Sequence, residues 1–122
     1  MVKTITVDGK SVTFKASAAI PRMYRLKFRR DIMQDMKDIE KATQEPGLEG
    51  ISPRLLDAFE NMAFLMAKHA TPDEVPETVE EWLDGFETFS IYEVFPTIVE
   101  LWTANMETLA TSKKNFVKRK GK

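Results

Sequence analysis

The 122-residue chain contains no cysteine and a single histidine. Without cysteine the protein has no disulfide, no thiolate ligand for a metal and no cysteine nucleophile. His69 has no second histidine or cysteine with which to build a transition-metal site. The five scattered glycines form no phosphate-binding loop, and the serines and threonines lack a matched base. We therefore predict that the protein is not an enzyme, with no catalytic residues, cofactor or metal.

Long apolar runs are also missing. No segment approaches the roughly 20 apolar residues of a membrane-spanning helix, and the first ten residues, MVKTITVDGK, lack the apolar core of a secretory signal. We expect a soluble, cytoplasmic protein that does not enter a membrane. Residues 1–112 are expected to form one domain. Residues 113–122 are expected to form a basic, flexible tail, because they have little to bury.

Charge is distributed unevenly along the chain. The net charge is −1, but residues 113–122 hold six basic and no acidic side chains, so the remainder carries −7. Residues 71–100 hold nine acidic side chains and no lysine or arginine. That segment lacks the alternating ligands and the glycine of a calcium-binding loop. We interpret it as a solvated acidic surface, partly at helix N-termini, where the helix dipole favours negative charge.

The N-terminal residues predict a β-hairpin at about 3–15. Two segments of alternating polarity flank Asp8-Gly9, a dipeptide that favours a type I′ turn because both of its residues must adopt positive φ. The turn determines the register of the strands. The predicted pairs are Val7 with Lys10, Ile5 with Val12, and Lys3 with Phe14. One face of the hairpin is then apolar and must pack on helices or on strands of another chain.

Apolar residues at helical spacing predict helices in the rest of the chain. The first stretch begins near Pro21 and runs to about Thr43, unless Asp31 caps a second segment after a break. Ser52-Pro53, after a loop over QEPGLEGIS, begins the most apolar and therefore central helix.

Two capping boxes predict two further helices. Thr78 and Ser90 are each followed three residues later by glutamate. Pro96 either kinks the last helix or marks its true first turn. The predicted fold is therefore mainly α, a compact bundle of four to five helices with a small N-terminal β-hairpin.

Several side chains are candidates for binding. Arg22, Arg25 and Arg29 share one side of the first helix. Lys27 can pair with Asp31 at i, i+4. We therefore expect an ordinary amphipathic helix and not a nucleic-acid surface. His69 lies near a helix end, where it can meet the carbonyl dipoles.

Seven methionines, most of them at helical spacing, either fill the core or form an adaptable surface for a partner helix. The candidate partner-binding residues are Met62, Met66, Trp82, Phe86, Trp102 and Met106.

The order of these motifs resembles the tail assembly chaperones of long-tailed bacteriophages, in the family found in phages and prophages of Gram-positive bacteria. A short hairpin that ends in an aromatic residue is followed by Pro-Arg-x-Tyr-Arg-x-x-Phe-x-x-Asp-Ile-x-x-Asp, and then by LLDAFENMAFLMAKHA, TVEEWLDGF and IVELWTANM. The residues of the first motif are Pro21, Arg22, Tyr24, Arg25, Phe28, Asp31, Ile32 and Asp35. Many relatives have glycine after the phenylalanine, where this chain has Arg29, which favours continuation of the helix.

The resemblance implies a protein that binds the long, helical tape measure protein, keeps it soluble and helps to recruit tail tube subunits. It implies action in the host cytoplasm, absence from the mature virion and, in many relatives, a longer frameshifted form. A homo-oligomer is a further expectation. Two alternatives remain open: a small nucleic-acid-binding or regulatory protein that uses the basic tail and residues 22–30, and a structural head–tail component.

Overall fold

The computed structural model describes residues 1–44 and 51–104. The elements follow the order β1 (Val2–Val7), β2 (Lys10–Lys15), α1 (Ile20–Phe28), α2 (Ile32–Gln44), α3 (Pro53–Ala70) and α4 (Val79–Asp84). Another helix begins at residue 91 and is described as far as residue 104; it is called the C-terminal helix below. The predicted class, a bundle of helices with a small N-terminal hairpin, is confirmed.

The hairpin has the predicted register. β1 and β2 are antiparallel, with Val7 opposite Lys10, Ile5 opposite Val12, and Lys3 opposite Phe14. Asp8 and Gly9 adopt φ of 53° and 75°, the positive values that a type I′ turn requires. Val7 and Phe14 are fully buried on the apolar face, which packs against α3. The hairpin therefore meets the chain's own helices on this face.

The first helical stretch is broken, which corrects the expectation that Arg29 continues the helix. α1 ends at Phe28, and Arg29 adopts a left-handed conformation with φ 57° and ψ 41°. The Arg29 N–H donates to the carbonyl of Arg25 at 2.8 Å and so closes the last turn. α2 then begins at Ile32, after Asp31, as the alternative prediction had it. Burial of residues on both sides of the break outweighs the local preference of arginine.

Local capping signals position α3 and α4. The Ser52 hydroxyl accepts from the Leu55 N–H at 3.3 Å, and Pro53 occupies the first turn of α3. The Thr78 hydroxyl accepts from the Glu81 N–H at 3.2 Å at the start of α4. Each side chain satisfies a backbone donor that has no partner within its helix. Both predicted helix starts are confirmed.

The C-terminal helix begins directly after Ser90, whose carbonyl accepts from the Val94 N–H at 3.0 Å. Pro96 lies inside the helix and is exposed, so it does not mark the first turn. Glu100 of this helix forms an ion pair with Lys3 of β1 at 2.5 Å. The pair joins the last described helix to the first strand.

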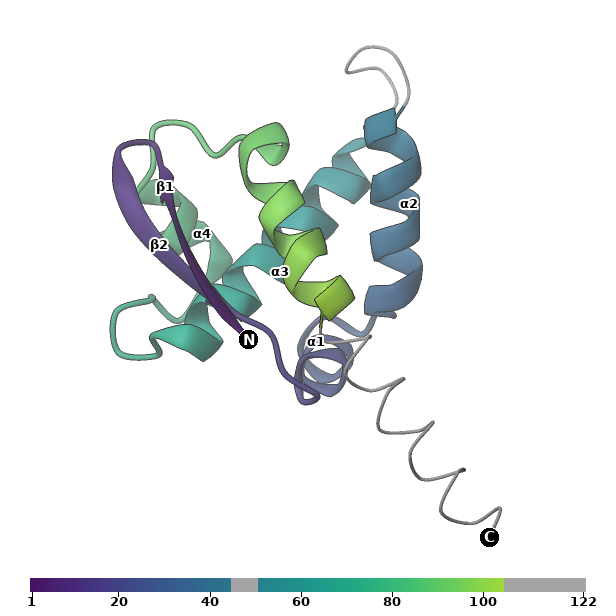
Figure 1. The fold of residues 1–122 in the computed structure, drawn as a ribbon, viewed down its shortest axis with the longest axis horizontal. Coiled ribbons are helices and arrows are strands. Elements are labelled where there is room, and N and C mark those ends of the chain that lie inside the picture. The colour runs from purple at the N-terminus through teal and green to yellow at the C-terminus, as the bar shows by residue number, and fades with distance from the viewer. Residues whose placement is uncertain (45–50, 105–122) are drawn as a thin grey trace, which may run out of the picture.

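α3 lies at the centre of the fold. In Figure 1 it crosses the middle of the molecule, with the hairpin and α4 on one side and α2 on the other. Nine of its residues are buried, and the ring centroids of Phe59 and Phe95 lie 6.2 Å apart where α3 meets the C-terminal helix. The prediction that α3 is the central helix is confirmed, because elements on several sides cover its wide apolar surface.

Some sequence-based predictions fall outside the described residues. These are most of the loop before Ser52, the tail at 113–122 and Met106. Within residues 1–44 and 51–104, no helix has the length and apolar character needed to cross a membrane.

Candidate partner-binding surface

Four of the predicted partner-binding residues lie in the core. Met62 and Met66 are completely buried in α3, and Trp82 and Trp102 are only 6% and 8% exposed. A partner could reach them only if the core opened. In this conformation Met62 and Met66 fill the core, which was the alternative interpretation of the methionines. Neighbouring elements cover α3 on several sides. Met106 lies outside the described residues.

Phe86 is half-buried at the edge of an aromatic cluster. Its ring centroid lies 5.5 Å from that of Trp82 and 5.3 Å from that of Phe89. Lys10 Nζ lies 5.4 Å from the Phe86 centroid and donates to the Gly85 carbonyl. These contacts hold the segment after α4 against the hairpin turn, so Phe86 has a packing role and keeps only part of its surface free.

Four residues of the family-like motif are candidate site residues: Tyr24 and Phe28 pack together, Asp31 caps α2, and Arg25 is exposed. Tyr24 is buried, and its ring centroid lies 5.2 Å from that of half-buried Phe28. Asp31 Oδ1 accepts from the Met33 N–H at 2.9 Å at the start of α2. Arg25 points into solvent and forms no ion pair within the described residues. Tyr24, Phe28 and Asp31 therefore build the α1–α2 corner, and Arg25 is available for contact.

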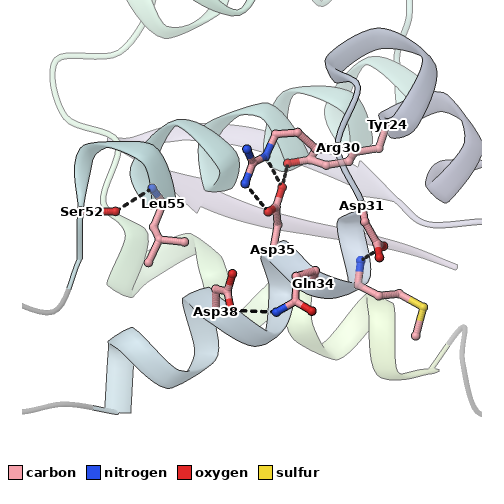
Figure 2. A network of polar contacts seen from close by, with 9 residues as sticks. Tyr24, Arg30, Asp31, Gln34, Asp35, Asp38, Ser52 and Leu55 are labelled. Carbon is pink, nitrogen blue, oxygen red and sulfur yellow. Dashed lines mark hydrogen bonds and ion pairs between the residues drawn. The ribbon is translucent and has the colours of Figure 1, made fainter.

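A buried polar network joins α1 to α2 (Figure 2). The Tyr24 hydroxyl donates to Asp35 Oδ2 at 2.7 Å. Arg30 Nε donates to the same oxygen at 2.7 Å, and its terminal nitrogen donates to Asp35 Oδ1 at 2.5 Å. The fork of the guanidinium thus binds the carboxylate in bidentate fashion. Because only 3% of the Asp35 side chain is exposed, the network fixes the angle between the helices in a water-poor place.

The network also shifts the acidity of its members. Burial acts to raise the pKa of Asp35, but the hydrogen bonds from Arg30 and Tyr24 outweigh burial and lower it. Burial is the largest cause of the raised pKa of Tyr24, and the hydrogen bond to Asp35 is the next largest. The hydrogen bond to Asp35 raises the pKa of Arg30. The network is therefore an ionised pair with a neutral phenol at neutral pH and acts as a structural clamp.

The sequence alone did not predict this network. A signal was present, since Asp35 occupies a position in the apolar stripe of α2 together with Ile32, Met36 and Ile39. An acid at such a position needs a buried partner. The partners, Tyr24 and Arg30, lie in another element and in the turn, so only the fold could identify them.

The solvent-facing side of α1, together with its C-cap residue, carries three arginines and a leucine. Arg22, Arg25, Leu26 and Arg29 are all exposed, and Leu26 is 64% exposed. We call these four residues the arginine face. None of the three arginines forms an ion pair with a carboxylate in the described part of the chain. The predicted pair of Lys27 with Asp31 is absent too, because α1 ends before Asp31 and Lys27 Nζ lies 5.7 Å from the Phe64 centroid.

An open pocket of about 480 Å³ adjoins the arginine face at the α1–α2 corner. Its lining includes Arg25, Arg29, Asp31 and Met33. Met33 is 45% exposed, so this surface offers apolar as well as cationic groups. Leu56 and Tyr92 are further exposed apolar residues, at 38% and 48%. The pocket and the arginine face together have the composition of a protein-binding surface, in which arginine and methionine are enriched.

His69 lies in the last turn of α3, as predicted, and its side chain contacts a residue outside the helix. Its Nε2 lies 3.0 Å from the Ser17 hydroxyl, in the segment between β2 and α1. Burial, followed by the positive charges of Lys15 and the N-terminal ammonium, lowers the pKa of His69. A neutral imidazole gains little from helix carbonyl dipoles. His69 therefore ties the end of α3 to the chain before α1.

The described residues contain no group of three or more histidine and acidic side chains arranged to hold a metal ion. Comparisons of the chain with protein families, curated proteins and solved structures found no match.

Proposed function

We propose that this protein is a tail assembly chaperone of a long-tailed bacteriophage. It binds the tape measure protein, keeps it soluble in the host cytoplasm and helps to recruit tail tube subunits, and it is absent from the mature virion. The resemblance in motif order across the chain suggests the partner. One observation supports a binding role: cationic and apolar side chains are exposed beside one open pocket, namely Arg22, Arg25, Leu26 and Met33. Arg22 and Arg25 have no ion-pair partner in the described residues.

The proposed mechanism is shielding of apolar surface. A long helical protein aggregates when its apolar side chains are exposed, and a partner that covers them keeps it in solution. Exposed Leu26, Met33, Leu56 and Tyr92 supply apolar contacts on helices. The acidic residues 71–100 discourage nonspecific association with other acidic molecules.

Co-expression tests the proposal. The tape measure protein of the same phage is produced in bacteria with this chain, or with an unrelated acidic protein of similar size as a control. We expect a soluble tape measure protein only with this chain, and copurification of the two. Equal solubility with the control protein would refute the proposal. Recovery of the chain from purified virions would favour a structural tail component instead.

The exposed arginines also favour a second candidate, a nucleic-acid-binding protein that uses residues 22–30 together with the basic residues at 113–122. Binding of this kind depends strongly on salt, because it releases counterions from phosphates. A gel shift that disappears between low and moderate salt and on deletion of residues 113–122 would support this candidate.

A further inference from the structure

We infer that the arginine face and the adjoining pocket bind an amphipathic helix of the tape measure protein that carries carboxylates beside apolar side chains. This inference rests on the proposed function and adds the site and the chemistry of the bound segment. It rests on three observations: the unpaired arginines, the exposed apolar groups beside them and the backbone conformation of Arg29.

The arginines fit carboxylates on a helix. Arg22 and Arg25 stand one turn apart on α1, and Arg29 follows after its last residue, so the three charges extend over about 10 Å. Carboxylates at i, i+3 and i+7 of a partner helix span the same length. Guanidinium groups bind carboxylates in bidentate fashion, as Arg30 binds Asp35 within this protein.

The exposed apolar groups favour a protein helix over a nucleic acid. Leu26 is the most exposed large apolar residue of α1, at 64%, and Met33 borders the pocket from α2. An aliphatic side chain gains from contact with another apolar side chain but offers nothing to a phosphate.

The presence of an arginine at position 29 points to a role outside folding, because glycine suits this backbone conformation better. The φ of Arg29, 57°, lies in the left-handed region, where glycine is the usual residue after a helix. An arginine here costs stability, and such strained positions concentrate at functional sites. The side chain lines the pocket beside Arg25. A guanidinium at this place adds a binding group that glycine could not provide.

Charge reversal tests the inference within the co-expression assay. Arg22→Glu/Arg25→Glu changes two exposed residues of the arginine face. Lys37→Glu/Lys41→Glu makes the same change in net charge on exposed residues of α2 that do not line the pocket. We expect the first variant to lose copurification of the tape measure protein and to weaken its affinity at least about tenfold, and the second to behave as the unchanged protein. Thermal unfolding of both variants confirms that they are folded.

Two further variants separate binding from folding. Arg29→Gly removes the strain and one guanidinium, so we expect a more stable protein that binds the tape measure protein several-fold more weakly. Arg29→Lys keeps the charge, and we expect it to bind more tightly than Arg29→Gly. A purely structural Arg29 would leave affinity unchanged in both variants, which would overturn this part of the inference.

The outcomes distinguish the inference from the proposed function. If the unchanged protein solubilises its partner and the Arg22/Arg25 reversal does so equally well, the inference fails and the proposed function stands. If the unchanged protein does not solubilise the partner, both fail. Two other outcomes would also overturn the inference. In one, the arginines bind nucleic acid but not the tape measure protein. In the other, charge reversal abolishes self-association but leaves binding of the tape measure protein unchanged. Restored binding by a tape measure protein with lysines at its acidic positions would support it most directly.

Discussion

Arg29 holds the backbone position at which a helix most often ends in glycine. A left-handed conformation costs an ordinary residue about 1–2 kcal/mol. The chain nevertheless breaks here. Tyr24 on one side of the break and Ile32 on the other are both buried, and α1 and α2 each pack against α3. Tertiary packing has thus overridden a local preference.

Arg29→Gly is therefore expected to raise the free energy of unfolding by about 0.5–1 kcal/mol, since relief of the strain exceeds the greater chain entropy of glycine. Urea denaturation measures the change. Arg25→Gly is the control, because Arg25 lies inside α1, where glycine costs about 1 kcal/mol. Equal destabilisation by both changes would contradict the assignment of strain to Arg29.

The Tyr24–Arg30–Asp35 network gives a second prediction at this scale. Asp35→Ala leaves Arg30 and the Tyr24 hydroxyl without their acceptor, so we expect a loss of about 2–3 kcal/mol in unfolding free energy. A third of the Arg30 side chain is exposed, which keeps this value below that of a fully buried pair. Tyr24→Phe removes one hydrogen bond and should cost about 1 kcal/mol. Chemical denaturation of both variants, and of the double variant, tests whether the two effects are coupled.

Among the elements, the hairpin depends most on its neighbours. A two-stranded hairpin is barely stable alone in water. Here β2 packs on α3, Lys3 pairs with Glu100, and Asp8 Oδ2 accepts from the Glu87 N–H at 2.9 Å. The hairpin covers apolar surface of α3, so each element stabilises the other.

Phe14→Ala is expected to lower the unfolding free energy by about 3–5 kcal/mol, because the Phe14 side chain is fully buried and its removal leaves a cavity beside α3. Thr6→Ala, on the exposed face of the neighbouring strand, should cost less than about 1 kcal/mol. Thermal and urea unfolding measure both values. A small effect at Phe14 would mean that the hairpin contributes little to the core.

For the whole molecule, two groups that join different parts of the fold, Asp35 and His69, link stability to pH. Asp35 has a lowered pKa in the folded protein, so it contributes stability above the unfolded-state pKa of about 3.9, and this contribution is lost as pH falls further. His69 also has a lowered pKa, so the unfolded chain takes up a proton first as pH falls below about 6.5. Both groups stabilise the protein less at acid pH.

The unfolding free energy should therefore fall from pH 7 towards pH 5 through His69, and again below about pH 4 through Asp35. His69→Gln should flatten the first region, and Asp35→Asn should reduce the slope in the second. Urea denaturation across this pH range measures both effects. The chain has one histidine, so its imidazole resonance is unambiguous in an NMR titration. An apparent pKa above 6.5 would contradict the environment described for His69.

Sequence-based predictions were correct mainly where the structure depends on residues close together in the chain or on one repeating apolar pattern. The turn at Asp8-Gly9, the caps at Ser52 and Thr78 and the central place of α3 were predicted correctly. The break at Arg29 was left as an alternative. For the candidate site, Arg25 is exposed, whereas the four methionine and tryptophan residues at 62, 66, 82 and 102 are buried.

By itself the sequence determined the hairpin register, the beginnings of the helices and the mainly α class, because each depends on contacts within a few residues or on one repeating apolar pattern. Only the tertiary structure decided that Asp35 meets Tyr24 and Arg30, and which apolar residues stay exposed. It alone showed that Arg22, Arg25 and Arg29 remain unpaired in the described residues. Those outcomes depend on how α1, α2 and α3 pack, which brings together residues that no local spacing relates.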